Sequence, residues 1–136
     1  MCVDAEHVYF YTPNIGPFRK IRLSDMSLVA DVTISSMSSV VCDGQGYAYI
    51  STSTRQIVKV RLSDMQIVGT LETGTGVSDP IMASLAVGPM GYFGPTQTTK
   101  KVLKYTLNAG TDALPSTQLT GLTRAAYSTY CTVITR

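Results

Sequence analysis

The segment KIRLSDMSLV at 20–29 recurs as KVRLSDMQIV at 59–68, an offset of 39 residues. A third and weaker copy, KYTLN, stands at 104–108. Self-similarity at a fixed period of this length is the signature of a chain built by stacking one structural unit several times. The fold and the function are therefore analysed by comparing equivalent positions of the repeated unit.

Segments upstream of each copy repeat as well. They are rich in aromatic and β-branched residues, which favour strands, and glycine, proline and aspartate separate them, as expected of tight turns. The aromatic segments are VYFYT (8–12), AYIST (48–52) and GYFGPT (91–96), and the segments before them are CVD (2–4), SSVVCDGQG (38–46) and ASLAVGPMG (83–91).

Each unit is predicted to form four short antiparallel strands. Side chains alternate along 57–62, which places Val58 and Val60 on one face and Lys59 and Arg61 on the other. The Leu-Ser-Asp-Met step has Ser and Asp where a tight turn favours them, so it joins the third strand to the fourth. No segment shows a capped helical period, so almost no helix is predicted. In the central unit the strands cover roughly 38–42, 47–52, 56–62 and 66–72.

The pattern G-Y-a-Y-i-s-T…i-V-K-v-r-L-s-d-m…v-g-t-L at 46–71 resembles the blades of the YVTN/NHL-like β-propeller superfamily. The resemblance covers most of the chain. It implies an all-β fold of three four-stranded antiparallel β-propeller-type blades, as a partial propeller or as half of an oligomeric ring. The first copy departs from the pattern at Ala5-Glu6-His7, and the third departs at Pro95 and around Leu114–Leu119. Propellers serve many unrelated activities, so the resemblance specifies architecture and not function.

One repeat domain is expected over residues 1–136, because this length suits a single domain. The blades are placed at approximately 1–35, 36–76 and 77–121, with 122–136 as a closing inner strand. Closed propellers usually have about 4–8 blades, and an open terminal blade presents unpaired edges and an apolar face. Three arrangements follow: two chains that close a six-bladed ring together, a fragment of a longer propeller or repeat array, and a single three-blade stack with unusual capping.

The composition excludes several classes of function. A net charge of +2 is too small to argue for nucleic acid or an anionic membrane as partner. No apolar run approaches the roughly 18 residues of a membrane span, and no basic segment followed by an apolar run indicates a signal peptide. Only 15% of the residues are charged and serine and threonine are abundant. This slightly favours an extracellular protein and leaves the compartment undetermined.

The three cysteines, Cys2, Cys42 and Cys131, are widely spaced and odd in number, which does not indicate a disulfide framework. Cys2 and Cys42 occupy matching places just before the turn that opens a repeat. We therefore expect them to be small buried hydrophobic side chains in equivalent positions. The chain has no C-x-x-C pair and no second histidine that would suggest redox or metal chemistry. No metal site and no cofactor are therefore predicted.

Residues that are able to support catalysis have simpler structural interpretations. His7, the only histidine, opens the first repeat and is expected in a surface turn and not as a catalytic base. The loop at 74–79 lacks the third glycine and the following helix of a phosphate-binding loop. Asp25 and Asp64 are the same position in two repeats, where an Asx-type turn explains them. No carboxylate spacing suits calcium, and no catalytic residue is predicted.

Two recurring sets of side chains are candidates for a ligand-binding surface. Basic residues recur on the third strands. They are expected to form a solvated outer face or ion pairs with neighbouring acids, or alternatively a stripe that binds an acidic partner or glycan. Tyrosines recur one strand earlier, where they pack between blades or form sugar- or peptide-stacking surfaces. The basic set is Lys20, Arg22, Lys59, Arg61 and Lys104, and the candidate ligand-binding residues are Tyr9, Tyr49, Tyr92, Lys59 and Arg61.

The sequence favours a non-enzymatic β-propeller repeat module that acts as a structural or interaction scaffold, such as a building block of a larger assembly. The expected partners are proteins or further copies of the chain, which meet through exposed blade edges. A carbohydrate-binding propeller completed by oligomerisation is the first alternative, weakened by the absence of tryptophan. A lactonase- or hydrolase-type propeller enzyme is the second, weakened because such sites gather metal-binding carboxylates, asparagine and histidine, of which this chain has few.

Overall fold

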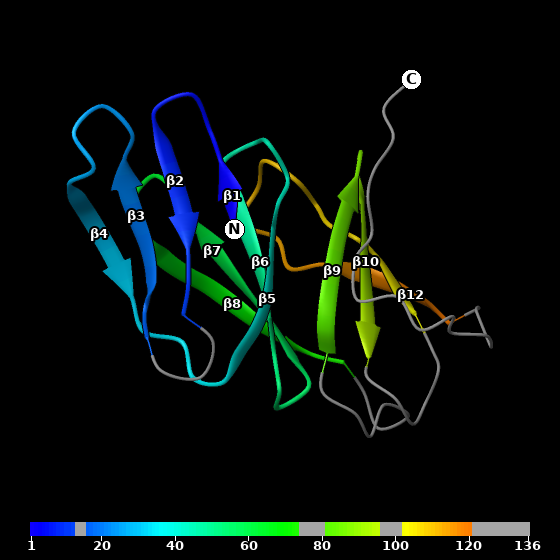
Figure 1. Ribbon diagram of the computed structural model, residues 1–136. Coiled ribbons are helices and arrows are strands. Elements are labelled where there is room, and N and C mark those ends of the chain that lie inside the picture. The colour runs from blue at the N-terminus through cyan, green and yellow to red at the C-terminus, as the bar shows by residue number, and fades with distance from the viewer. Residues whose placement is uncertain (13–15, 74–80, 96–101, 121–136) are drawn as a thin grey trace.

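Residues 1–12, 16–73, 81–95 and 102–120 are described by the computed structural model. They form three antiparallel sheets of four strands each, in which every strand pairs with the next along the chain. Figure 1 shows the sheets side by side, with the second between the first and the third. The expected all-β class is confirmed. The predicted closing strand at 122–136 and the glycine loop at 74–79 lie outside the described residues.

Strand boundaries follow the repeat, and in the second sheet they match the expected segments to within one residue. The first sheet consists of β1 (Cys2–Val3), β2 (His7–Phe10), β3 (Phe18–Arg22) and β4 (Leu28–Val32). The second consists of β5 (Met37–Cys42), β6 (Tyr47–Thr52), β7 (Gln56–Arg61) and β8 (Gln66–Glu72). The third consists of β9 (Ile81–Val87), β10 (Met90–Pro95), β11 (Leu103–Thr106) and β12 (Ser116–Thr120).

The Leu-Ser-Asp-Met step forms a tight turn between the third and fourth strands of the first two sheets. Asp25 and Asp64 each accept a hydrogen bond from the backbone N–H two residues later, at 3.0 and 3.2 Å. These are the predicted Asx-type bonds. The methionine that ends the step has a left-handed backbone, with φ of 57° at Met26 and 56° at Met65, which is uncommon for residues other than glycine.

Each third strand has a register irregularity close to its lysine. The pairing between the third and fourth strands shifts directly after Lys20, Lys59 and Lys104. A bulge of this kind bends a strand and changes the direction of its side chains. Its recurrence at one position makes the setting of the lysine a property of the repeat.

Two hydrophobic clusters hold the three sheets together. Tyr9 and Ile50 belong to the cluster between the first and second sheets, and Tyr49, Phe93 and Leu103 belong to the cluster between the second and third. The innermost strand β5 lies beside both β1 and β9. Because consecutive side chains of a strand point to opposite faces, the second sheet buries both of its faces, one in each cluster.

A disulfide joins Cys2 of β1 to Cys42 of β5, with Cα atoms 6.1 Å apart. The expectation of two separate buried thiols is therefore wrong. Cys2 pairs with Tyr9, whereas in the second sheet Val41, and not Cys42, pairs with Tyr49. Cys42 is thus one residue out of step with Cys2, and consecutive residues face opposite sides of a strand. This offset turns the two thiols toward each other between the first two sheets.

Reduction of this disulfide should destabilise the protein by about 3–4 kcal/mol, because the bond closes a long loop in the unfolded chain. Urea denaturation with and without reductant measures the loss. The double variant Cys2→Ser/Cys42→Ser is the control and should show the lower stability in both conditions. Peptide mapping of the non-reduced protein should recover Cys2 linked to Cys42, and equal stability before and after reduction would contradict the assignment.

Candidate functional site

A dense group of polar interactions surrounds Lys59 at the interface between the second and third sheets. Lys59 lies on β7 and is fully buried, at 0% exposed. Its Nζ atom donates to the backbone carbonyls of Leu107, Asn108 and Ala113 at 3.3, 3.0 and 2.7 Å. All three belong to the connection between β11 and β12. One ammonium group therefore holds the turn region of the next sheet through charge-assisted hydrogen bonds.

Two aromatic rings of β6 flank this ammonium group. The Nζ atom lies 4.7 Å from the ring centroid of Tyr47 and 5.1 Å from that of Tyr49, distances that suit cation–π attraction. Tyr49 also donates its hydroxyl proton to the carbonyl of Leu107 at 2.8 Å, which Lys59 contacts as well. The two side chains thus converge on one carbonyl of the third sheet.

Asp112 completes the group at its exposed side. Its carboxylate accepts hydrogen bonds from the Tyr47 hydroxyl at 2.9 Å and from the Arg61 guanidinium at 2.8 Å. Arg61 also pairs with Asp64 of its own turn at 2.8 Å. Asp112 lies between β11 and β12, whereas Tyr47 and Arg61 belong to the second sheet. These bonds therefore join the same two sheets.

Burial and neighbouring charges determine the protonation of the inner groups. Burial lowers the pKa of the Lys59 ammonium group, while the charges of Asp43 and Asp112 act in the opposite direction. Burial also raises the pKa of the Tyr49 hydroxyl well above its ordinary value, and Asp43 adds to the rise. At Tyr47 the hydrogen bond to Asp112 is the largest cause of a raised pKa. Both hydroxyls therefore remain protonated donors near neutral pH.

The same lysine contact recurs between the first and second sheets. Lys20 on β3 is 9% exposed and donates to the carbonyl of Leu62 at 2.9 Å. Leu62 and Leu107 each stand three residues after the lysine of their own repeat. We call this bond the inter-sheet lysine contact: the third-strand lysine of one sheet donates to this leucine carbonyl of the next sheet.

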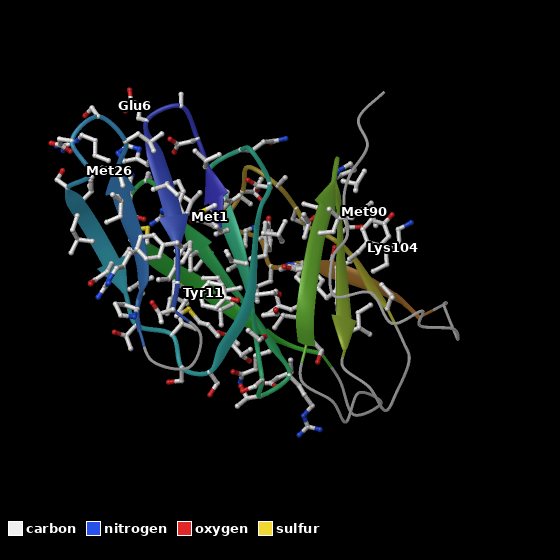
Figure 2. All side chains as sticks on the ribbon, viewed as in Figure 1. Met1, Glu6, Tyr11, Met26, Met90 and Lys104 are labelled. Carbon is white, nitrogen blue, oxygen red and sulfur yellow. A yellow bond between two sulfur atoms is a disulfide. The ribbon has the colours of Figure 1, made fainter. Side chains whose placement is uncertain are left out.

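The third lysine of the repeat is Lys104 on β11, and it is partly exposed. Its Nζ atom lies 5.7 Å from the ring centroid of Tyr92, much as that of Lys20 lies 5.8 Å from the ring of Tyr9. Its neighbour Leu103 belongs to the cluster with the second sheet, so Lys104 points to the opposite face. Figure 2 shows Lys104 on the side of the third sheet away from the other two sheets.

The expectation of a solvated basic stripe is wrong for Lys20 and Lys59, which are buried between sheets. The alternation of side chains places Lys59 and Arg61 on one face, as predicted, but it does not reveal that another sheet covers that face. Ion pairs with neighbouring acids, the other expectation, are present for Arg22 with Asp25 at 3.1 Å and for Arg61 with Asp64 at 2.8 Å.

The recurring tyrosines occupy different environments. Tyr9 and Tyr49 are 1% and 0% exposed, so their rings pack between sheets and present no face to solvent. Tyr92 is partly exposed. The structure gathers Tyr49, Lys59 and Arg61 at one interface and leaves Tyr9 and Tyr92 on the other two sheets. A role of these five residues in ligand binding stays a prediction.

Sequence reasoning did not single out Tyr47, Asp43 and Asp112 as members of this group. Tyr47 carries a usable signal, because it lies two residues before Tyr49 and so shares its face. Asp112 carries none, since its contact depends on the path of the β11–β12 connection, which is longer than the turns of the other two sheets.

His7 was expected in a surface turn, but it is the first residue of β2 and its side chain is only 16% exposed. Its Nδ1 atom lies 3.4 Å from a carboxylate oxygen of Asp4. Within the described residues, no three metal-ligating side chains cluster, and no helix is suited to cross a bilayer. A surface hollow is lined by Gly16, Pro17 and residues 33–37, among which there are hydroxyl and apolar side chains but no charged one.

Asp4 and Asp43 each hold the turn between the first two strands of their sheet. Asp4 Oδ1 accepts the backbone N–H groups of Glu6 and His7 at 2.8 and 2.7 Å, and Oδ2 accepts the Tyr9 hydroxyl proton at 2.6 Å. Asp43 accepts two backbone N–H groups in the same way. Burial tends to raise the pKa of Asp4, but these hydrogen bonds outweigh it and the pKa falls to about 2.

Comparison with known proteins shows the fold alone. No protein-family model matches the chain, and no curated protein matches it. Among solved structures it is similar to BamB from Moraxella catarrhalis, a β-propeller protein, with a TM-score of 0.63 and 12% identity over 87% of this chain. The match covers 33% of the BamB chain, so this chain spans about a third of that protein. The fold is therefore propeller-like.

Replacing Lys59 with methionine should lower the free energy of unfolding by about 2–4 kcal/mol, because the buried side chain loses three hydrogen bonds to the third sheet. Lys20→Met should cost about 1–2 kcal/mol, since Lys20 serves one carbonyl. The control Arg22→Met removes an exposed ion pair and should change the stability by less than about 1 kcal/mol. Urea denaturation measures this order, and equal losses for Lys59→Met and Arg22→Met would contradict it.

Asp4→Asn should weaken the dependence of stability on acid pH. The hydrogen bonds to Asp4 lower its pKa to about 2 in the folded protein, from an ordinary value of 3.8. Ionised Asp4 therefore stabilises the fold above the unfolded value, and this contribution is lost as the pH falls through the folded value. The stability difference from wild type should be widest near neutral pH and should close as the pH falls from about 4 to about 2.

Thermal unfolding at a series of pH values measures this difference. Asp31→Asn on the exposed strand β4 is the control for loss of one negative charge. A difference between wild type and Asp4→Asn that stays constant across the acid range would show that the three hydrogen bonds do not hold the carboxylate.

Proposed function

We propose that this chain is a non-enzymatic module of three β-propeller-type blades, related to the YVTN/NHL-like repeats, that acts as an interaction scaffold. One observation carries the proposal: the recurring third-strand lysines Lys20 and Lys59 join neighbouring sheets. Lys59, Tyr49 and Tyr47 direct their polar atoms at the third sheet, and Lys20 directs its Nζ atom at the second. The repeat thus provides hydrogen bonds between neighbouring blades.

Lys59 has the strongest chemical claim among these groups, since burial lowers its pKa and catalytic lysines are often tuned in that way. A catalytic amine needs a free lone pair and access to substrate. The Nζ atom of Lys59 is fully buried and donates to three carbonyls. A structural role accounts for all of its contacts.

The disulfide adds a statement about compartment. Bonds of this kind form and persist in oxidising environments such as the extracellular space or the periplasm, and are rare in reducing ones. The bond between Cys2 and Cys42 therefore supports a scaffold that works outside the cytosol. The carbohydrate-binding alternative gains no such support, because the rings of Tyr9 and Tyr49 are buried.

The proposal is tested by measuring catalysis and partner binding on the same preparation. Esters and lactones are offered as substrates, with divalent cations or with a chelator. No turnover should co-elute with the protein in size-exclusion chromatography. Leu28 and Val29 are exposed on β4, an edge strand of the first sheet. A photo-crosslinking residue at Val29 should capture a protein partner, and this capture should be lost in Leu28→Asp and kept in Asp31→Asn on the same strand. Turnover that co-purifies with the protein and disappears in a folded Asp112→Asn variant would overturn the proposal.

A further inference from the structure

The outer face of the first sheet is the face turned away from the second sheet. Tyr9 and Lys20 point toward the second sheet, so their strand neighbours point outward. This outer face carries the apolar side chains Val8, Phe10, Ile21, Leu23 and Met26.

Each of these positions has a counterpart in the second sheet that is buried against the first sheet. Leu62 is 7% exposed, whereas its counterpart Leu23 is 42% exposed. Met65 is 3% exposed, whereas its counterpart Met26 is 68% exposed. The residue type and the turn conformation are the same, so the difference lies in the neighbouring sheet that covers one pair and not the other.

The outer face of the first sheet is therefore built like a surface that another sheet covers. Its further counterparts Ala48, Ile50 and Val60 are all fully buried in the second sheet. Arg19 departs from this pattern, since it stands where the second sheet has Val58. Leu23 and Met26 are exposed on this face, Val8 and Phe10 are partly exposed, and Ile21 is 9% exposed. Exposed apolar side chains that adjoin one another in this way mark an association surface.

The outer face of the third sheet carries the complementary half of the contact. Tyr92 and Lys104 form a cross-strand pair, as Tyr49 and Lys59 do in the second sheet. In the second sheet that pair donates to a leucine carbonyl of the following sheet. Lys104 already lies beside the ring of Tyr92, so the donor side of the contact is formed in advance.

Both internal interfaces have the same polarity: the lysine belongs to the earlier sheet and the leucine carbonyl to the later one. A third contact of this type would pair Lys104 with the carbonyl of Leu23, the remaining repeat position in the described chain. The first and third sheets lie on opposite sides of the second (Figure 1), with Met26 and Lys104 at opposite ends (Figure 2). The Leu23 carbonyl that meets Lys104 must then come from another copy.

We propose that two copies of this chain associate head to tail, with the third sheet of each packed on the first sheet of the other. The Lys104 Nζ atom of one copy donates to the Leu23 carbonyl of the other, and Met26 is covered as Met65 is. This inference rests on the proposed scaffold function and names its partner. Because each contact joins two different surfaces, it either closes or propagates. Two copies supply six sheets, which is within the range of closed propellers.

The first test is the native mass of the wild-type chain by sedimentation velocity and light scattering over the micromolar range. The expected mass is twice 14.6 kDa. Met26→Asp alters the outer face of the first sheet, and Lys104→Glu alters that of the third. Each variant alone should raise the dimer dissociation constant at least about thirty-fold, since each places an unpaired charge in both contacts.

Mixing the two variants distinguishes head-to-tail association from a symmetric contact. Met26→Asp keeps an intact third sheet and Lys104→Glu keeps an intact first sheet, so the mixture retains one unaltered contact and should form mixed dimers. A symmetric contact offers no such rescue. Thr54→Asp, on an exposed turn of the second sheet, is the matched control and should dimerise as wild type does.

Wild-type chain that stays monomeric throughout, or variants that fail to rescue each other, would overturn the inference. Masses that grow with concentration beyond two copies would overturn closure by two copies. A monomer that still captures a different protein through Val29 would remove this inference and leave the scaffold function standing. Turnover that co-purifies with the dimer would overturn the non-enzymatic scaffold function and leave the head-to-tail association standing.

Discussion

A buried ammonium group has to be surrounded by acceptors, and this requirement sets the relation between neighbouring sheets. Lys59 loses its hydration on burial and donates instead to three backbone carbonyls of the next sheet. Those carbonyls lie in the connection between β11 and β12, outside the strand ladders. The lysine and the connection therefore satisfy each other, and neither is stable in this form without the adjacent sheet.

The recurring KxRLSDM segment makes physical sense around this lysine. The register shift directly after Lys59 sets the direction of its side chain, and the arginine two residues later pairs with the turn aspartate, as Arg61 does with Asp64. The leucine supplies the carbonyl that receives the lysine of the preceding sheet. Met65 is buried with that leucine in the hydrophobic cluster between the first two sheets. The lysine, arginine, leucine, aspartate and methionine of the repeat thus each serve their own sheet or the junction with a neighbour.

Sequence reasoning recovered the strands because alternation and turn residues are local signals. The four strands of the central repeat, and the shared face of Lys59 and Arg61, follow from a period of two. What covers that face is not local, so the pattern predicts a solvated face, ion pairs or a ligand-binding stripe for Lys59 and does not reveal its burial. The disulfide was missed for a related reason: the offset of one residue between Cys2 and Cys42 becomes visible only when each cysteine is referred to the tyrosine it pairs with.

The two junctions between sheets are held by different means. Between the first and second sheets, Lys20 donates to one carbonyl, and the disulfide ties β1 to β5. Between the second and third, Lys59 serves three carbonyls and Asp112 bonds to Tyr47 and Arg61. Strand β1 is only two residues long, so it adds few ladder bonds to its sheet. A covalent bond at this strand supplies what a short ladder cannot, so the first junction is held with fewer polar contacts than the second.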